Sequence, residues 1–316
     1  MSRSAKLHGL AASARIANLP SVVSNVWLGC VLGTDGRFPG NVAVLMVAGV
    51  SLCLAGNFLN DWADRDWDAA HRPERALPQA MFPAEFYLTV AVLCGLLGLG
   101  AAAAVNRWCL VVALVIGICI VVYTQTHKRT AWAVIPMGLC RALLPVMGIL
   151  GFVRPGDSSY VGWGTFTMLL VPIPVGLFCH IAGLSLGARN ESLAVPSTRA
   201  MRCAPLLFVA AAASMFVVWA WLGFRFLMPL GLSVLGLLPY GLWITYCLTI
   251  SRRPVSRQVA NLLAGIPLVD WIVLLPLALA WKGEWGGIPQ GPALCLLVPP
   301  LAVLAGKLLQ RLAPAT

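Results

Sequence analysis

Three aspartates in one short segment have a spacing that suits metal and phosphate chemistry. Asp61, Asp64 and Asp68 stand at positions i, i+3 and i+7, and Asn57 lies one helical turn earlier. On an α-helix these residues share one stripe, where three like charges destabilise each other unless a cation neutralises them. Mg²⁺ is the natural partner, because it prefers oxygen ligands and shares its shell with substrate phosphates. We therefore expect Asp61, Asp64 and Asp68 to be catalytic metal ligands, whereas Asp66 points off the stripe.

Cationic side chains follow the aspartates at two places in the chain. Arg72 and Arg75 come just after the acidic run, and Lys128 and Arg129 follow an apolar segment further on. Arginine offers forked donors to phosphate and lysine offers a point charge, so carboxylates, a metal ion and these cations together suit a diphosphate group. The alternative is an ordinary charged patch in solvent beside a membrane. We favour the diphosphate site because the aspartates share one face.

The elements that position these residues must be helices in a membrane. Hydrophobic residues make up 59% of the 316 residues, charged residues only 10%, and the mean hydropathy is +0.85. A lipid-embedded chain satisfies its backbone hydrogen bonds within helices, and the alternating pattern of a barrel is absent. We expect an all-α integral membrane protein in one domain over residues 1–316. The predicted spans lie near residues 17–34, 41–60, 84–105, 108–124, 131–152, 161–187, 204–223, 227–249, 258–281 and 291–309.

The charge distribution predicts how the chain is oriented. With a cytoplasmic N-terminus, sixteen of the 22 Lys and Arg residues fall in segments on the cytoplasmic side, five fall opposite and one lies inside a span. This excess places both termini in the cytoplasm and favours ten spans over nine. The net charge of +11 can face anionic lipid or an anionic substrate, so it implies no nucleic-acid partner. We see no removable signal peptide, and the ten scattered cysteines are typical of small core residues.

A resemblance to a known family follows from the same motif. The run from Asn60 to Asp68, followed by Arg72-Pro73-x-Arg75-x-x-Pro78, resembles the NDxxDxxxD signature and the RP-x-R-x-x-P that follows it in the UbiA superfamily of intramembrane prenyltransferases. The segment Arg15-x-x-Asn18-Leu19-Pro20-Ser21 is similar to the approach to that family's first span. Residues 127–128 and 137–144 look most like the EboC-like branch, whose members accompany small biosynthetic or export gene clusters. The resemblance covers about residues 10–200.

The resemblance implies a bundle of nine to ten transmembrane helices around a central cavity that opens laterally to lipid. In such a protein, Mg²⁺ holds a prenyl diphosphate, loss of diphosphate leaves an allylic carbocation, and an aromatic or lipophilic acceptor captures it. Prenyl diphosphate, acceptor, membrane lipid and pathway proteins are therefore the expected partners, in a bacterial inner membrane. The residues expected to bind substrate are Asn57, Asn60, Arg72, Arg75, Lys128, Arg129, Arg141, His180 and Glu191.

The second acidic motif of the family departs from its usual pattern here. The corresponding segment, 180–191, offers only His180 and Glu191 as ligands on one helical stripe, and Arg189 would oppose a second metal ion. A lone histidine on an apolar helix is more often a satisfied core residue, although an ionisable group inside a membrane favours a functional role. Glu191 remains a candidate for one second-site carboxylate.

Two further charges, Arg141 and Asp270, lie inside predicted spans. Such charges are costly unless they are paired or face a cavity. Either the two residues form a structural pair, or Arg141 faces the substrate.

These observations leave several functions open. The first is a Mg²⁺-dependent prenyltransferase. The second is a degenerate member of the same family that binds or helps export a lipophilic metabolite, because its second motif is altered. A CDP-alcohol phosphotransferase is disfavoured because the DGxxAR opening of that family is absent before Asp61. A secondary transporter is disfavoured because the two halves share no pattern of Gly and Pro breaks.

Overall fold

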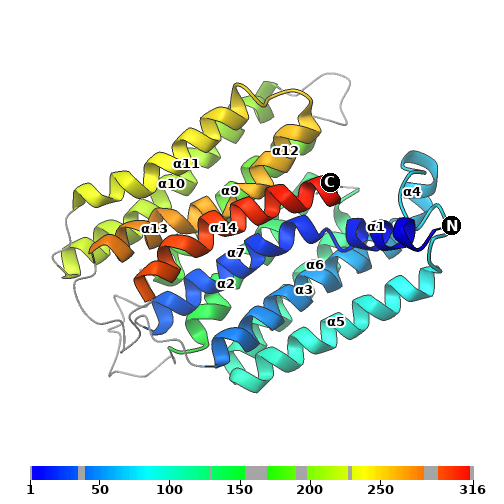
Figure 1. Ribbon diagram of the computed structural model, residues 1–316, viewed down its shortest axis with the longest axis horizontal. Helices are drawn as coiled ribbons and strands as arrows, with labels where there is room; N and C mark the ends of the chain where they lie inside the picture. The colour runs from blue at the N-terminus through cyan, green and yellow to red at the C-terminus, as the bar shows by residue number, and fades with distance from the viewer. Residues whose placement is uncertain are drawn as a thin grey trace.

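The computed structural model describes residues 2–34, 40–128, 130–153, 169–189, 198–226, 230–280 and 291–313. Within these ranges the chain forms helices and no strand, and most helices run along one common direction in a single bundle (Figure 1). The α-helices are α1 (Arg3–Ser13), α2 (Leu19–Thr34), α3 (Asn41–Ala63), α4 (Arg65–His71), α5 (Ala84–Val105), α6 (Arg107–Thr126), α7 (Val134–Leu150), α9 (Pro172–Arg189), α10 (Thr198–Phe226), α11 (Ser233–Leu248), α12 (Val255–Ala264), α13 (Ile266–Ala280) and α14 (Gly291–Leu312). The short 3₁₀ turns are η1 (Ile16–Asn18), η2 (Ala131–Ala133) and η3 (Leu230–Leu232).

The helices confirm an all-helical membrane fold. Among the described residues, seven helical segments are long and apolar enough to cross a membrane: Ile16–Thr34, Asn41–Ala63, Ala84–Val105, Arg107–Thr126, Cys203–Trp221, Val255–Ala280 and Leu294–Leu312. Three shorter apolar helices, Val134–Leu150, Pro172–Ala188 and Ser233–Leu248, lie where three more spans are predicted. Every predicted span therefore overlaps a helix, while a count of ten membrane crossings remains a prediction.

The core of the bundle is built around α2, α7 and α13. Backbones approach closely where glycines leave room: a Cβ on Gly29 of α2 would lie 2.1 Å from the carbonyl oxygen of Pro145 in α7. In the same way, a Cβ on Gly236 of α11 would lie 2.5 Å from the carbonyl oxygen of Ile272 in α13. Such contacts are typical of packing between membrane helices, where small residues replace the hydrophobic driving force available in water. The outer helices α5, α6, α10, α11 and α14 instead expose many leucine, isoleucine and valine side chains, as lipid contact requires.

One predicted span, 258–281, is not a single straight helix. The chain forms α12 and then α13, with Gly265 between them. The indole of Trp243 donates a hydrogen bond to the carbonyl of Asn261 at 3.0 Å, and a Cβ on Gly265 would lie 2.3 Å from that indole nitrogen. Pro267 follows at the start of α13, a position where the missing proline N–H is tolerated. A side chain from α11 thus fills the break, which lies beside Pro267, a residue from which the sequence predicts a kink or split in this span.

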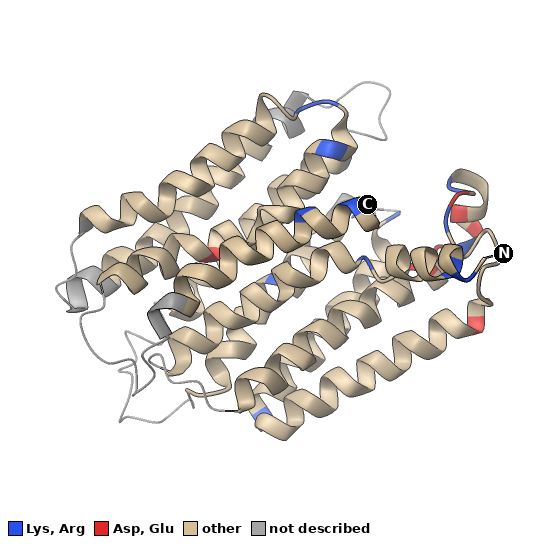
Figure 2. Cartoon of the chain, in the orientation of Figure 1, with Lys and Arg blue, Asp and Glu red and all other residues tan. Residues whose placement is uncertain are grey.

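The charged residues are concentrated at one end of the bundle. Both termini and α4 lie toward this end in Figure 1, and Figure 2 shows most of the acidic residues there, together with many of the basic ones. Long stretches of the helices between the two ends carry no charge in the same view. The elements from α1 to α6 therefore bring most of the described acidic residues together at one end of the bundle.

Candidate functional site

The aspartates lie where α3 passes into α4. Asp61 is in the last turn of α3, Asp64 lies between the two helices, and Asp68 is in α4. All three are buried, with exposed fractions of 7%, 6% and 2%. Asp66, in contrast, has a side chain that is 90% exposed, which confirms that it lies off the stripe. The helical spacing therefore turned three carboxylates inward and one outward.

The N-terminal segment closes over this stripe. Arg15 adopts the left-handed conformation (φ 46°, ψ 51°) that few residues other than glycine take, and it turns the chain from α1 into η1. Its guanidinium then donates hydrogen bonds at 3.0 Å to Asn57 and at 3.0 Å to Asp61. Asn57 in turn donates to the backbone carbonyl of Ala14 at 2.9 Å. The turn thus fixes a cation against the first half of the predicted stripe.

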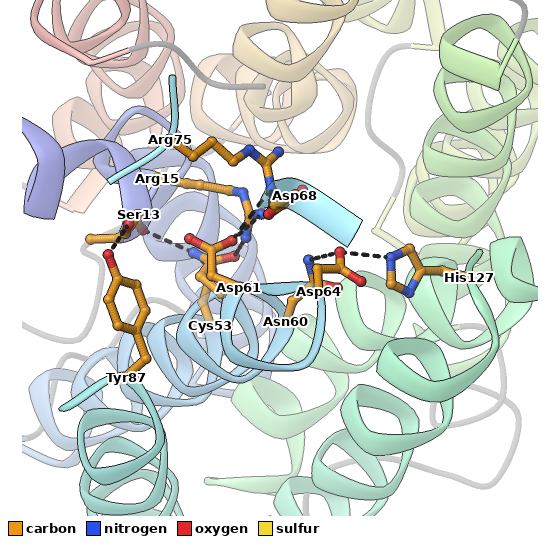
Figure 3. Close-up of polar contacts among 12 residues, drawn as sticks. Ser13, Arg15, Cys53, Asn60, Asp61, Asp64, Asp68, Arg75, Tyr87 and His127 are labelled. Carbon is orange, nitrogen blue, oxygen red and sulfur yellow. Dashed lines mark hydrogen bonds and ion pairs between the residues drawn. The ribbon is translucent and has the colours of Figure 1, made fainter. Parts of the chain in front are cut away.

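Arg75 links two of the three aspartates, as the close-up in Figure 3 shows. Its guanidinium lies 2.7 Å from Asp68 and 3.8 Å from Asp61. Arg15 and Arg75 retain side-chain exposures of 19% and 25%, whereas the two carboxylates are nearly enclosed. Two partly exposed cations therefore neutralise two buried anions on this side of the site.

Asp64 forms a second group of contacts with the loop after α6. It accepts hydrogen bonds from the Nε2 of His127 at 3.0 Å and from Asn60 at 3.2 Å, and the ammonium of Lys128 lies 3.3 Å away. Burial by itself raises the pKa of Asp64, but the contacts with His127 and Lys128 outweigh burial and hold the pKa below its ordinary value. Lys128 also lies 3.4 Å above the ring centroid of Trp67 in α4. These contacts hold α4 and α6 together at the site.

The oxygen atoms present here suit a hard cation bound together with phosphate. Among the described residues, no three carboxylate, imidazole or thiol groups are arranged as a complete metal site. Mg²⁺ does not require one, since it usually keeps several waters and takes one or two carboxylates plus phosphate oxygens. The buried Oδ1 atoms of Asp68 and Asn60 have no hydrogen-bond partner, so both are available as oxygen ligands. The residues therefore fit Mg²⁺ as part of a metal–diphosphate complex.

Among the other predicted substrate residues, Arg72 is described without a side-chain contact to the aspartates. Arg72 follows α4 directly, and among the described residues no hydrogen bond or ion pair joins its side chain to an aspartate. Arg129 and Glu191 fall outside the described residues, so their predicted roles stay predictions.

His180 lies within the bundle, away from the aspartates. Its ring is fully buried in α9 and bonds to the hydroxyl of Tyr240 at 3.1 Å and to the carbonyl of Leu262 at 3.2 Å. Since a carbonyl only accepts, Nε2 is the donor to Leu262, and the Tyr240 hydroxyl beside Nδ1 also donates to the carbonyl of Phe208 at 3.3 Å. The structure thus places His180 as a satisfied link between α9, α11 and α12, and does not join it to Asp61 or Asp64.

The two charges inside the spans do not form a direct ion pair. Asp270 accepts hydrogen bonds from Ser24 at 2.6 Å and from the amide of Asn25 at 3.0 and 2.9 Å. Arg141 instead donates to the other end of the Asn25 amide, at 3.4 Å. Among the described residues no ion pair joins Arg141 to Asp270, so Asn25 stands between them.

Sequence reasoning did not include Arg15 or His127 among the site residues. Arg15 lies 42 residues before Asn57, and only the turn between α1 and η1 brings it to the stripe. Its position three residues before Asn18, in a segment that resembles the family's approach to the first span, was the available signal. His127 adjoins the predicted Lys128, and its place directly after a helix leading into the site was the corresponding signal.

Comparison with known proteins places this arrangement in a family. The model of the UbiA prenyltransferase family matches residues 22–266. Digeranylgeranylglyceryl phosphate synthase of Thermococcus kodakarensis is 24% identical over 244 residues, which cover 74% of this chain and 83% of that protein. The synthase of the same name from Methanopyrus kandleri is 29% identical over 106 residues, so there the match spans 33% of this chain and only 39% of that relative.

Solved structures agree with this fold. A structure from work on digeranylgeranylglyceryl phosphate synthase in membranes superposes with a TM-score of 0.56, at 14% sequence identity, over 96% of this chain and 98% of the other. The predicted fold is thereby confirmed, and the EboC-like branch remains a prediction. From the aspartate stripe, the helical bundle and the match over most of its length, the chain belongs to the UbiA prenyltransferase family.

Proposed function

We propose that this protein transfers a prenyl group from a prenyl diphosphate to a small lipophilic acceptor with the help of Mg²⁺. The observation that carries this proposal is the pairing of three buried aspartates with cationic side chains that remain partly exposed. A diphosphate group needs both components, because carboxylates hold the metal ion while arginine and lysine bind the phosphate oxygens. A buried carboxylate with an unpartnered oxygen, as in Asp68, completes the donor set.

Each group of residues has a distinct task in this reaction. Asp61, Asp64 and Asp68 would hold Mg²⁺, which supplies a positive charge that stabilises the departing diphosphate. Arg15, Arg75 and Lys128 neutralise these aspartates in the structure and lie within reach of the same site, so they can bind phosphate oxygens as the carboxylates take up the metal ion. Positive charges fixed at the point where negative charge develops lower the barrier without a protein nucleophile. The chain thus provides electrostatic stabilisation of a leaving group.

The location follows from the charge distribution. We infer that the site faces the cytoplasm, with both termini on the same side, because the Lys and Arg excess lies there. The membrane that we propose is the inner membrane of a bacterium. Diphosphate donors would reach the site from that side. Proteins of the same biosynthetic pathway are the partners that would supply donor and acceptor.

A second candidate function rests on a specific observation in α9. The described residues of this helix, Pro172–Arg189, contain no aspartate or glutamate, although the family's second acidic motif is expected near its end. A chain with one intact motif would bind a diphosphate lipid without transferring its prenyl group. Such a protein would instead bind or help export a lipophilic metabolite.

Turnover of labelled donors separates the two candidates. Purified full-length protein in detergent would be incubated with Mg²⁺ and radiolabelled geranyl, farnesyl or geranylgeranyl diphosphate. Geranylgeranylglyceryl phosphate, whose chemistry the names of the relatives suggest, and simple phenols would serve as acceptors. We expect Mg²⁺-dependent diphosphate release and a labelled apolar product, both abolished by EDTA. Tight donor binding without release under any pairing would support the binding protein, and absence of donor binding would refute both candidates.

A further inference from the structure

A second group of basic residues lies on α12, on the turn before it and on the end of α14. Figure 1 shows α12 between α11 and α14, and Figure 2 shows these basic segments in blue. Among the described residues, no hydrogen bond or ion pair engages the guanidinium groups of its arginines, all of which are exposed. The members of this group, called the basic surface below, are Arg252, Arg253, Arg257, Lys307 and Arg311.

No carboxylate among the described residues neutralises the basic surface. From residue 198 onward, the only described carboxylate side chain is that of Asp270. Asp270 is fully buried and accepts its hydrogen bonds from Ser24 and Asn25. The cations of the aspartate site differ, since each of them lies against a carboxylate. Five cations gathered without an anion create a positive potential that attracts an anionic ligand.

Hydrogen bonds between side chains hold the basic surface in a fixed arrangement. The ammonium of Lys307 donates to the side-chain oxygen of Asn261 in α12 and to Gln310 at 3.1 Å. Gln310 in turn donates to a backbone carbonyl of α12 at 2.7 Å, so α14 is joined to α12 at two points. Arg257 lies one helical turn before Asn261, and Arg311 lies one turn after Lys307. Since residues four apart share a helix face, three cations from two helices meet on one side of this junction.

The turn before α12 is joined to the same junction. The amide of Asn261 donates to the hydroxyl of Ser251 at 2.6 Å, and Gln258 donates to the carbonyl of Cys247 in α11 at 3.1 Å. Ser251 directly precedes the two arginines of the turn. The basic surface is therefore ordered without a ligand, which lowers the entropy cost of binding one.

An apolar stripe on α14 leads to the basic surface. Its leucines recur every three or four residues, the spacing of one helix face, and their exposed fractions lie between 49% and 55%. The stripe is about 16 Å long at about 1.5 Å per residue, close to half of the roughly 30 Å hydrocarbon core of a bilayer. Lys307 and Arg311 each follow a leucine of the stripe by three residues, so both cations adjoin its end. These leucines are Leu297, Leu301, Leu304 and Leu308.

We propose that the basic surface binds the headgroup of an anionic phospholipid, whose acyl chains lie along the leucine stripe of α14. The phosphate would contact Arg257, Lys307 and Arg311, because arginine forks and a lysine ammonium bind phosphate oxygens well. A zwitterionic headgroup brings its own cation, which these residues repel. Basic sites between transmembrane helices on the cytoplasmic side are suited to anionic headgroups, and the orientation proposed above places the basic surface on that side.

This site is separate from the transfer reaction and from membrane topology. None of its residues contacts the aspartates, so the inference stands whether or not the protein transfers a prenyl group. Lys and Arg residues also orient membrane proteins, but orientation depends on their number and not on an ordered arrangement. Selective binding of one lipid class therefore distinguishes a site from ordinary topological charge.

Titration with defined lipids tests the proposal. Full-length protein, delipidated in dodecyl maltoside, would be titrated with dioleoylphosphatidylglycerol or dioleoylphosphatidylcholine, with the gain in thermal midpoint as readout. We expect phosphatidylglycerol to bind wild-type protein at least about tenfold more tightly, and the double variant Arg257→Gln/Arg311→Gln to lose this preference. Arg3→Gln/Lys6→Gln is the matched control and should keep it, because it also removes two exposed cations, from α1.

The other arms separate the remaining explanations. Equal affinity of wild-type protein for the two lipids overturns the proposal, and so does an equal loss in the two double variants, which indicates unspecific surface charge. Sodium phosphate that raises the midpoint as much as phosphatidylglycerol shows a phosphate site without lipid recognition, which also overturns it. Loss of phosphatidylglycerol binding in Arg75→Gln, with Arg257→Gln/Arg311→Gln unaffected, places the lipid at the aspartates and refutes the assignment.

Single substitutions cover the case that the double variant does not fold. Arg257→Gln and Arg311→Gln each change one exposed side chain, and each should weaken phosphatidylglycerol binding by about threefold or more. Arg257→Lys/Arg311→Lys keeps both charges and should retain the preference for the anionic lipid. Wild-type affinity in both single glutamine variants would contradict the proposed site.

Discussion

Replacing Asp61 by asparagine removes one negative charge from the centre of the site at almost constant shape. Asp61 is 7% exposed, lies 3.0 Å from Arg15 and 3.8 Å from Arg75, and is one of the three proposed metal ligands. The amide can still accept a hydrogen bond from Arg15, so the backbone of α3 should remain in place. We expect the variant to fold and to lose Mg²⁺-dependent binding of the donor.

The size of this loss follows from the charges. Two unit charges 4 Å apart interact by about 4 kcal/mol at an effective dielectric constant of about 20. Removing the Asp61 charge therefore costs a divalent cation at that distance about 8 kcal/mol of attraction. Release of Arg15 and Arg75, which then bind the diphosphate more freely, offsets part of it. With about a third of this loss left after screening and the release of the two arginines, the net loss of binding free energy is roughly 2.7 kcal/mol. At about 1.4 kcal/mol per factor of ten, this is about a hundredfold in affinity or rate.

The assay compares two substitutions of the same kind. Binding of a non-cleavable geranylgeranyl thiodiphosphate would be measured by calorimetry with and without Mg²⁺, for wild-type protein, Asp61→Asn and Asp66→Asn. Asp66 belongs to the same acidic run, yet its side chain is 90% exposed and its ion pair with Arg65 spans 3.8 Å. Such a surface pair contributes little, so Asp66→Asn should change affinity by no more than about twofold. Equal effects of the two variants, or a Mg²⁺ response unchanged in Asp61→Asn, would refute the electrostatic account.

Three other predictions concern different parts of the molecule. Arg15→Gln should weaken Mg²⁺–diphosphate binding by about tenfold or more, since it removes a charge-assisted contact of about 1.5–3 kcal/mol. Arg65→Gln should leave this binding unchanged, and calorimetry with the same thiodiphosphate compares the two variants. Gly29→Ala should destabilise the protein by about 2–3 kcal/mol, because the new methyl group meets the backbone of α7, whereas Gly100→Ala, which meets nothing within 4 Å, should leave the thermal midpoint in detergent unchanged. The pKa of Asp64 is held below its ordinary value, so the stability that its carboxylate contributes is present above about pH 4 and is lost as the pH falls through the lowered pKa. The thermal midpoint, followed from pH 7 to 3, should therefore decrease less on the acid side in Asp64→Asn than in wild-type protein.

Much of this protein follows from local rules applied to the sequence. The membrane imposes helices on long apolar segments, because nothing else satisfies backbone hydrogen bonds in hydrocarbon. The i, i+3, i+7 spacing by itself distinguished the inward Asp61, Asp64 and Asp68 from the outward Asp66, since side chains on a helix repeat every 3.6 residues. These features need no information about distant parts of the chain.

Contacts between distant segments needed the tertiary structure. The sequence left open whether Arg141 pairs with Asp270, and only the packing of α2 between α7 and α13 places the Asn25 amide between the two charges. His180, predicted as a substrate residue, instead bonds to Tyr240 and Leu262, which are 60 and 82 residues away.

The aspartate site shows the same division. Its carboxylates were evident from one helical stripe, because all of them belong to one continuous segment of the chain. Its cations were only partly evident: Arg75 and Lys128 were predicted, but Arg15 reaches Asp61 across 46 residues through a left-handed turn, and His127 reaches Asp64 across 63. Helical periodicity determines which side chains share a face, but it contains no information on which other segment packs against that face. That choice is made by the fit of whole helices to one another, and so only the folded bundle decides it.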